Sequence, residues 1–76
     1  MREISTGDTV DISYIGSDTH NQLTIDVTWC ADMKFSGIVA SELYNSKEVD
    51  VFLDEDSIRI KNKGQIGNRV EILKVV

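Results

Sequence analysis

The side chains best suited to nucleophilic chemistry in this sequence are a single cysteine, Cys30, and a single histidine, His20. His20 comes just before a segment of alternating apolar and polar residues, and Cys30 comes just after it. At about 3.3 Å per residue, an extended segment between them spans about 25–30 Å. A nucleophile and its base must approach to about 3 Å. The sequence therefore predicts no catalytic dyad, and we expect the chain not to be an enzyme.

Ligands for a metal or a cofactor are also incomplete. One cysteine and one histidine cannot form a structural zinc site within one chain. The acidic run Asp54-Glu55-Asp56 offers oxygen ligands, but it lacks the glycine and the distal glutamate of an EF-hand loop. The spacing in Gly64-Gln65-Ile66-Gly67 matches neither a dinucleotide-binding loop nor a Walker loop. We expect no metal ion and no cofactor.

Charge is distributed unevenly along the chain. The net charge is −5, but residues 1–57 carry 3 basic and 12 acidic side chains, whereas residues 58–76 carry 5 basic and 1 acidic. A negative total argues against binding of the whole surface to nucleic acid or to an anionic membrane. We therefore expect no membrane partner, and we expect contacts to be made by separate acidic and basic faces.

The basic face is the strongest binding candidate. Its residues are Arg59, Lys61, Lys63 and Arg69. The first three recur at every second position and are expected to share one face of a strand, with Arg69 returning beside them. Such a face can contact an acidic protein surface or phosphates. These strands contain no aromatic residues of the kind that stack on single-stranded nucleic acid, so a protein partner is preferred and nucleic acid is the alternative.

The acidic residues form the opposite candidate surface. They are Asp8, Asp11, Asp18, Asp26, Asp32, Glu48, Asp50, Asp54, Glu55 and Asp56. Such a surface can dock on a basic protein groove, or it can compete there with nucleic acid as a mimic. It also serves ordinary solubility.

Two aromatic residues are candidate apolar anchors. Phe52 is out of phase with Val51 and Leu53, so a regular strand would place it on the outer face. Tyr44 lies in a short segment before that strand. An exposed patch of both would be typical of an interface, whereas a bulge or a second layer would bury Phe52 instead.

The elements that must position these residues are β-strands. Alternation is clearest from Leu23 to Trp29, where Leu23, Ile25, Val27 and Trp29 are expected to share the core face. Similar alternation covers 10–14, 49–54, 58–61 and 70–73. Gly37, inside a weaker segment at 33–40, indicates a bulge or a sharp bend.

Polar segments separate the strands. They are a loop at 16–21, an acidic turn at 54–56, and Asn62-Lys63-Gly64, where Gly64 is expected to adopt positive φ. Gly67-Asn68 indicates another reversal. The segment 41–46 allows at most one short helical turn.

These elements predict a single all-β domain over residues 1–76. Five or six short strands form a curled sheet or barrel, either SH3-like or OB-like, because closure protects the edge strands. One cysteine excludes an intramolecular disulfide, and the polar N-terminal residues do not resemble a signal peptide. We therefore expect a cytoplasmic binding module that acts as an adaptor, inhibitor or regulator, with its oligomeric state left open.

Overall fold

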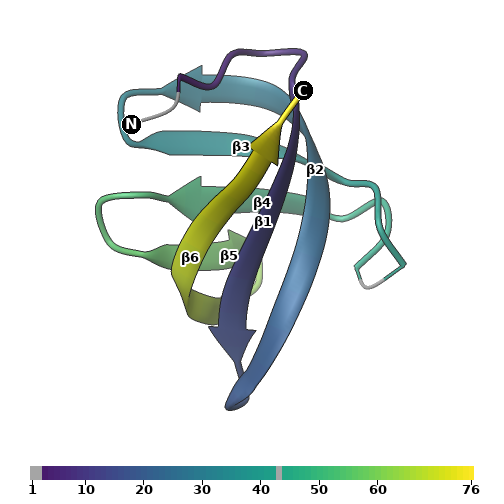
Figure 1. The fold of residues 1–76 in the computed structure, drawn as a ribbon. Coiled ribbons are helices and arrows are strands. Elements are labelled where there is room, and N and C mark those ends of the chain that lie inside the picture. The colour runs from purple at the N-terminus through teal and green to yellow at the C-terminus, as the bar shows by residue number, and fades with distance from the viewer. Residues whose placement is uncertain (1–2, 43) are drawn as a thin grey trace.

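The computed structural model describes residues 3–42 and 44–76, which form six β-strands. The strands are β1 (Thr9–Gly16), β2 (Thr19–Ala31), β3 (Lys34–Val39), β4 (Glu48–Phe52), β5 (Ser57–Ile60) and β6 (Gln65–Val75). Each strand pairs antiparallel with its neighbours along the chain, and β6 also pairs with β1, which closes the barrel (Figure 1). The predicted all-β fold and its barrel are confirmed.

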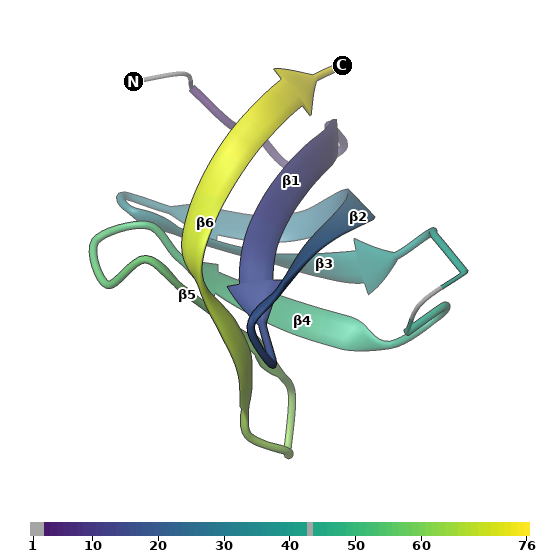
Figure 2. The same cartoon turned by 60° about the horizontal axis from the view of Figure 1, so that its bottom comes forward.

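Barrel closure depends on the long strand β2, which belongs to two layers. Its residues 19–26 pair with β1, and its residues 25–31 pair with β3. Figure 2 shows β1 and β6 crossing over the layer that contains β3 and β4. The apolar residues buried between the layers are Val10, Ile12, Tyr14, Leu23, Ile25, Val27, Phe35, Val39, Val49, Val51, Ile58 and Ile60. The alternation read from the sequence thus accounts for most of the core.

Trp29 is the main exception, because 49% of its surface is exposed. The register explains the difference. Val27 is paired with Gly37, but Trp29 is paired with Ser36, so one extra residue of β2 is inserted between them as a β-bulge. A bulge shifts the alternation by one residue. The expectation that Trp29 lies in the core is therefore wrong, and the half-buried Cys30 occupies the inward phase instead.

Gly37 lies opposite this bulge and permits a close approach of the two strands. A Cβ atom at Gly37 would lie 2.3 Å from the backbone oxygen of Asp26 and 2.6 Å from Cγ2 of Ile25. The irregularity expected at Gly37 is thus found in its partner strand β2. The glycine is needed because the backbone of β2 occupies the space of a side chain.

Three expected turns differ in detail. Asn62, with φ 64°, adopts the positive φ that was expected of Gly64. Gly67 is buried within β6 instead of reversing the chain, because it pairs with Ile58 of β5. A Cβ atom there would lie 2.3 Å from Cδ2 of Tyr14. Between β3 and β4, Tyr44 and Ser46 have positive φ, which a right-handed helical turn excludes. Leu43 lies outside the described residues.

Within residues 3–42 and 44–76, no helix is long and apolar enough to cross a membrane.

Candidate functional site

The four residues of the predicted basic face lie in three different settings. Arg59 is in β5 and faces Asp50 of β4 across the sheet. Lys61 and Lys63 follow the end of β5 in an exposed turn. Lys61 Nζ lies 3.1 Å from Glu48 Oε2 and is thereby paired with an acid. The strand β5 is too short to carry all three residues on one face.

Arg69 lies beyond the other end of β5. The register pairs Ser57 with Asn68, whereas Arg59 is paired with Gln65. Arg69 therefore stands next to the start of β5, and the turn with Lys61 and Lys63 follows its end. The barrel spreads these four cations over its surface. Arg59 has an acidic cross-strand partner, Asp50, and Lys61 forms an ion pair with Glu48.

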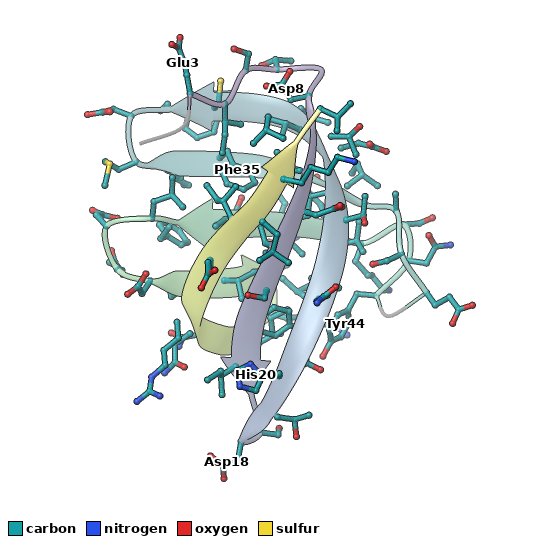
Figure 3. All side chains as sticks on the ribbon, viewed as in Figure 1. Glu3, Asp8, Asp18, His20, Phe35 and Tyr44 are labelled. Atoms are coloured by element: carbon teal, nitrogen blue, oxygen red, sulfur yellow. The ribbon has the colours of Figure 1, made fainter. Side chains whose placement is uncertain are left out.

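The two predicted aromatic anchors lie at opposite ends of β4. Tyr44 is in the connection that precedes β4, whereas Phe52 is the last residue of that strand. Figure 3 shows Tyr44 on the β3–β4 connection, on the opposite side of the barrel from the β4–β5 turn. Both side chains are half-buried. Tyr44 and Phe52 thus belong to different surfaces.

Phe52 instead belongs to a group on the outer face of β2, β3 and β4. Lys34 is the direct cross-strand partner of Phe52. Its Nζ atom lies 4.8 Å from the centroid of the Phe52 ring and 5.4 Å from that of the Trp29 ring. A cation within about 6 Å of an aromatic centroid is attracted to the ring. We call Trp29, Lys34 and Phe52 the outer aromatic patch.

Acidic residues surround the outer aromatic patch. Asp50 lies on the same face, where its carboxylate accepts a hydrogen bond from Ser36 Oγ. The β2–β3 turn contains Asp32, and the β4–β5 turn contains Asp54, Glu55 and Asp56. A backbone hydrogen bond of 2.8 Å from Leu53 N to Met33 O joins these two turns. The patch therefore combines exposed aromatic surface with a predominantly negative rim.

Other acidic residues have local structural roles. Asp11 accepts a hydrogen bond of 2.8 Å from Thr24 Oγ1, and Asp26 accepts one of 3.1 Å from Thr9 Oγ1. Asp8 accepts a hydrogen bond of 2.9 Å from the backbone N–H of Ser5. These contacts hold β1 against β2 and fix the segment that leads into β1. Asp8, Asp11 and Asp26 are therefore engaged in the fold, whereas Asp18 is exposed in the β1–β2 turn.

Cys30 and His20 both belong to β2 and lie near its opposite ends. His20 is paired with Ile15 of β1, whereas Cys30 is paired with Phe35 of β3. Figure 3 shows His20 and Asp18 toward the end of the barrel away from Glu3 and Asp8, with Asp18 at the tip. Cys30 lines a shallow pocket with Glu3, Ile4, Asp32, Met33 and Leu53. No group of three or more histidine, cysteine or acidic side chains is placed to hold a metal ion in the described part of the chain.

A second hollow, at the other end of the barrel, lies between Tyr14 and Tyr44. Burial raises the pKa of the Tyr14 phenol, and the neighbouring Tyr44 phenol raises it further. In the unfolded chain a tyrosine ionises near pH 10. The stability that comes from neutral Tyr14 is complete below that pH and is lost as the pH rises through the higher value of the folded state.

We therefore expect the free energy of unfolding to fall as the pH rises above about 10. Tyr14→Phe is expected to show a smaller fall, because the substitution removes the buried ionising group. Urea titrations followed by circular dichroism at several pH values measure both slopes. Equal slopes for the two proteins would contradict the assignment to Tyr14.

Comparisons of the chain with protein-family models, with curated proteins and with solved structures give no match. The function is therefore inferred from the residues of the chain itself. Among them, sequence reasoning missed Trp29 and Lys34 as surface residues. Their signal was the short turn at Asp32-Met33, which brings Cys30 opposite the inward-facing Phe35.

Proposed function

We propose that this chain is a non-enzymatic binding module that docks on a protein partner as an adaptor, inhibitor or regulator. The observation that carries the proposal is the 49% exposure of Trp29 within the outer aromatic patch. Tryptophan is strongly enriched among the residues that dominate binding energy at protein interfaces. A charged rim around an apolar centre is also the usual composition of such interfaces.

The arrangement of the remaining side chains supports a binding role over catalysis. The potential nucleophile Cys30 and the potential base His20 lie near opposite ends of one strand. A barrel of this size fills its interior with side chains. The sequential strand order also favours the SH3-like description over the OB-like one, which is a Greek-key barrel. A cytoplasmic location is part of the proposal, because the one cysteine is free.

The proposal is tested by immobilising the chain and capturing proteins from an extract of its source organism. We expect a partner that is retained by the wild type and lost from a column that carries Trp29→Thr. The charged rim predicts that the partner is released as salt rises from about 0.1 M to about 1 M, because the screening length shortens from about 10 Å to about 3 Å. Capture that is indifferent to Trp29 would contradict the proposal.

Nucleic-acid binding through Arg59, Lys61, Lys63 and Arg69 is the alternative function. The Lys61–Glu48 ion pair and the position of Arg59 opposite Asp50 reduce the positive charge that these residues can offer to phosphates. Affinity for phosphates depends on neutralising several of them together. Fluorescence anisotropy of labelled single- and double-stranded oligonucleotides at low salt tests this alternative. We expect no binding at tens of micromolar protein, and saturable binding would restore it.

A further inference from the structure

We infer that the outer aromatic patch receives a cationic side chain, by preference an arginine, from an extended basic segment of the protein partner. The inference rests on the proposed function and specifies the chemistry of the partner. The free chain already holds a cation at this position. Lys34 Nζ lies over both rings, 5.4 Å from the Trp29 centroid and 4.8 Å from the Phe52 centroid.

The rings therefore present faces that attract a positive charge, and Lys34 is a weak occupant of that position. Its ammonium group is a compact, strongly hydrated charge on a flexible stem, whereas an arginine guanidinium is planar and stacks on aromatic faces. With 49% of its surface exposed, Trp29 leaves room for a second group. A partner arginine can stack on the indole and displace the Lys34 ammonium toward solvent.

The surrounding acids supply the complementary charge. Lys61–Glu48 is the one ion pair among residues 3–42 and 44–76, so Asp50 has no cation within ion-pair distance there. Ser36 faces Trp29 on one side and Asp50 on the other. The indole and the carboxylate are thus two strand spacings apart, about 10 Å. The exposed acids Asp32, Asp54, Glu55 and Asp56 extend the negative rim.

An extended segment presents side chains on one face about every 6.6 Å. That repeat is shorter than the separation of about 10 Å, and the length of an arginine side chain can cover the difference. Successive cations at alternate positions can then reach the indole and a rim carboxylate together. An acidic partner segment would instead meet two cations, Lys34 and the Arg59 that faces Asp50, among five carboxylates. Like charges close together cost binding energy. The rim therefore favours a basic occupant.

Three end-blocked peptides test the inference: alternating arginine and serine, alternating glutamate and serine, and alternating citrulline and serine. Trp29 is the sole tryptophan, so its fluorescence reports binding directly. We expect saturable binding of the arginine peptide alone. Lys34→Gln is expected to tighten binding of the arginine peptide by about 3-fold, because the peptide no longer has to displace an ammonium group from the aromatic rings. Lys74→Gln removes the same charge from the exposed surface of β6 and is expected to cause a smaller change.

The sign of the Lys34→Gln effect decides between the two charge types. Binding of the glutamate peptide that weakens in Lys34→Gln overturns the inference, because Lys34 would then contact an acidic partner. Equal binding of the citrulline peptide also overturns it. If none of the three peptides binds to the wild type or to Lys34→Gln, the inference is overturned as well. That result differs from a failure of the proposed function, which would appear as a captured partner whose binding is unchanged by Trp29→Thr.

Discussion

Gly37→Ala is expected to remove about 3 kcal/mol or more from the free energy of unfolding, at the upper end of the usual cost of overpacking. The new Cβ would lie 2.3 Å from Asp26 O and 2.9 Å from the carbonyl carbon of the same residue. Both atoms belong to the backbone of β2, so no side-chain rotation relieves the clash. A domain of this length has roughly 4–10 kcal/mol of stability in total, so the loss is severe.

Gly64→Ala is the matched control for this prediction. No atom lies within 4 Å of a Cβ built at Gly64, and the residue is exposed in the turn before β6. Its substitution should change stability by no more than about 0.5 kcal/mol, as is usual for such surface positions. Urea unfolding of the three proteins measures the difference. A similar midpoint for Gly37→Ala and the wild type would show that the β2–β3 pairing differs from the one described.

Trp29→Thr is expected to weaken partner binding by about 30-fold or more, the equivalent of about 2 kcal/mol for a residue at the centre of an interface. The exposed indole contributes little to the core, and threonine is well suited to a strand. Stability should therefore change by less than about 1 kcal/mol, most of it from the lost attraction to Lys34. Titration of the captured partner with both proteins measures the affinity.

Leu73→Thr provides the control on another exposed apolar residue. Leu73 is 41% exposed and lies in β6, where a register shift leaves it without a partner in β1. It is in a different strand from each residue of the outer aromatic patch. We expect its substitution to leave partner affinity within about 2-fold, as for surface positions away from an interface core. Equal losses in both variants would argue against a localised docking face.

Much of the barrel can be predicted from alternation alone. Alternation predicts the inward residues of β1, β2 and β4 correctly in the segments 10–14, 23–27 and 49–51. It does so because one buried face imposes a period of two residues. The alternating segments predict five or six strands, and the need to protect edges predicts closure. Alternation cannot indicate where an extra residue enters a strand, so it placed Trp29 inside.

The correct position of Trp29 was available from the adjacent turn. The two-residue turn Asp32-Met33 pairs Ala31 with Lys34 and Cys30 with Phe35. Directly paired residues of an antiparallel sheet point to the same face. Since Phe35 must face the core, Cys30 faces inward and Trp29 faces outward. The turn has to be identified before the strand, because the longer alternating run places Trp29 on the opposite face.

The basic face shows a different limit of sequence reasoning. The spacing of Arg59, Lys61 and Lys63 suits a strand, but β5 ends at Ile60. Where a short strand ends depends on its partners, and Lys61 N already donates to Glu48 O at 3.0 Å in the turn. The pairing of Lys61 with Glu48 likewise depends on tertiary contacts that one strand cannot reveal.

The most direct test of the docking face is hydroxyl-radical footprinting of the chain, free and bound to its captured partner. The radical oxidises exposed tryptophan, phenylalanine, methionine and leucine, so one experiment reports on Trp29, Phe52, Met33 and Leu73. A docking face at the outer aromatic patch predicts that oxidation of Trp29 and Phe52 falls in the complex while oxidation of Leu73 is unchanged. Undiminished oxidation of Trp29, together with protection of Leu73, would contradict it and place the partner on β6.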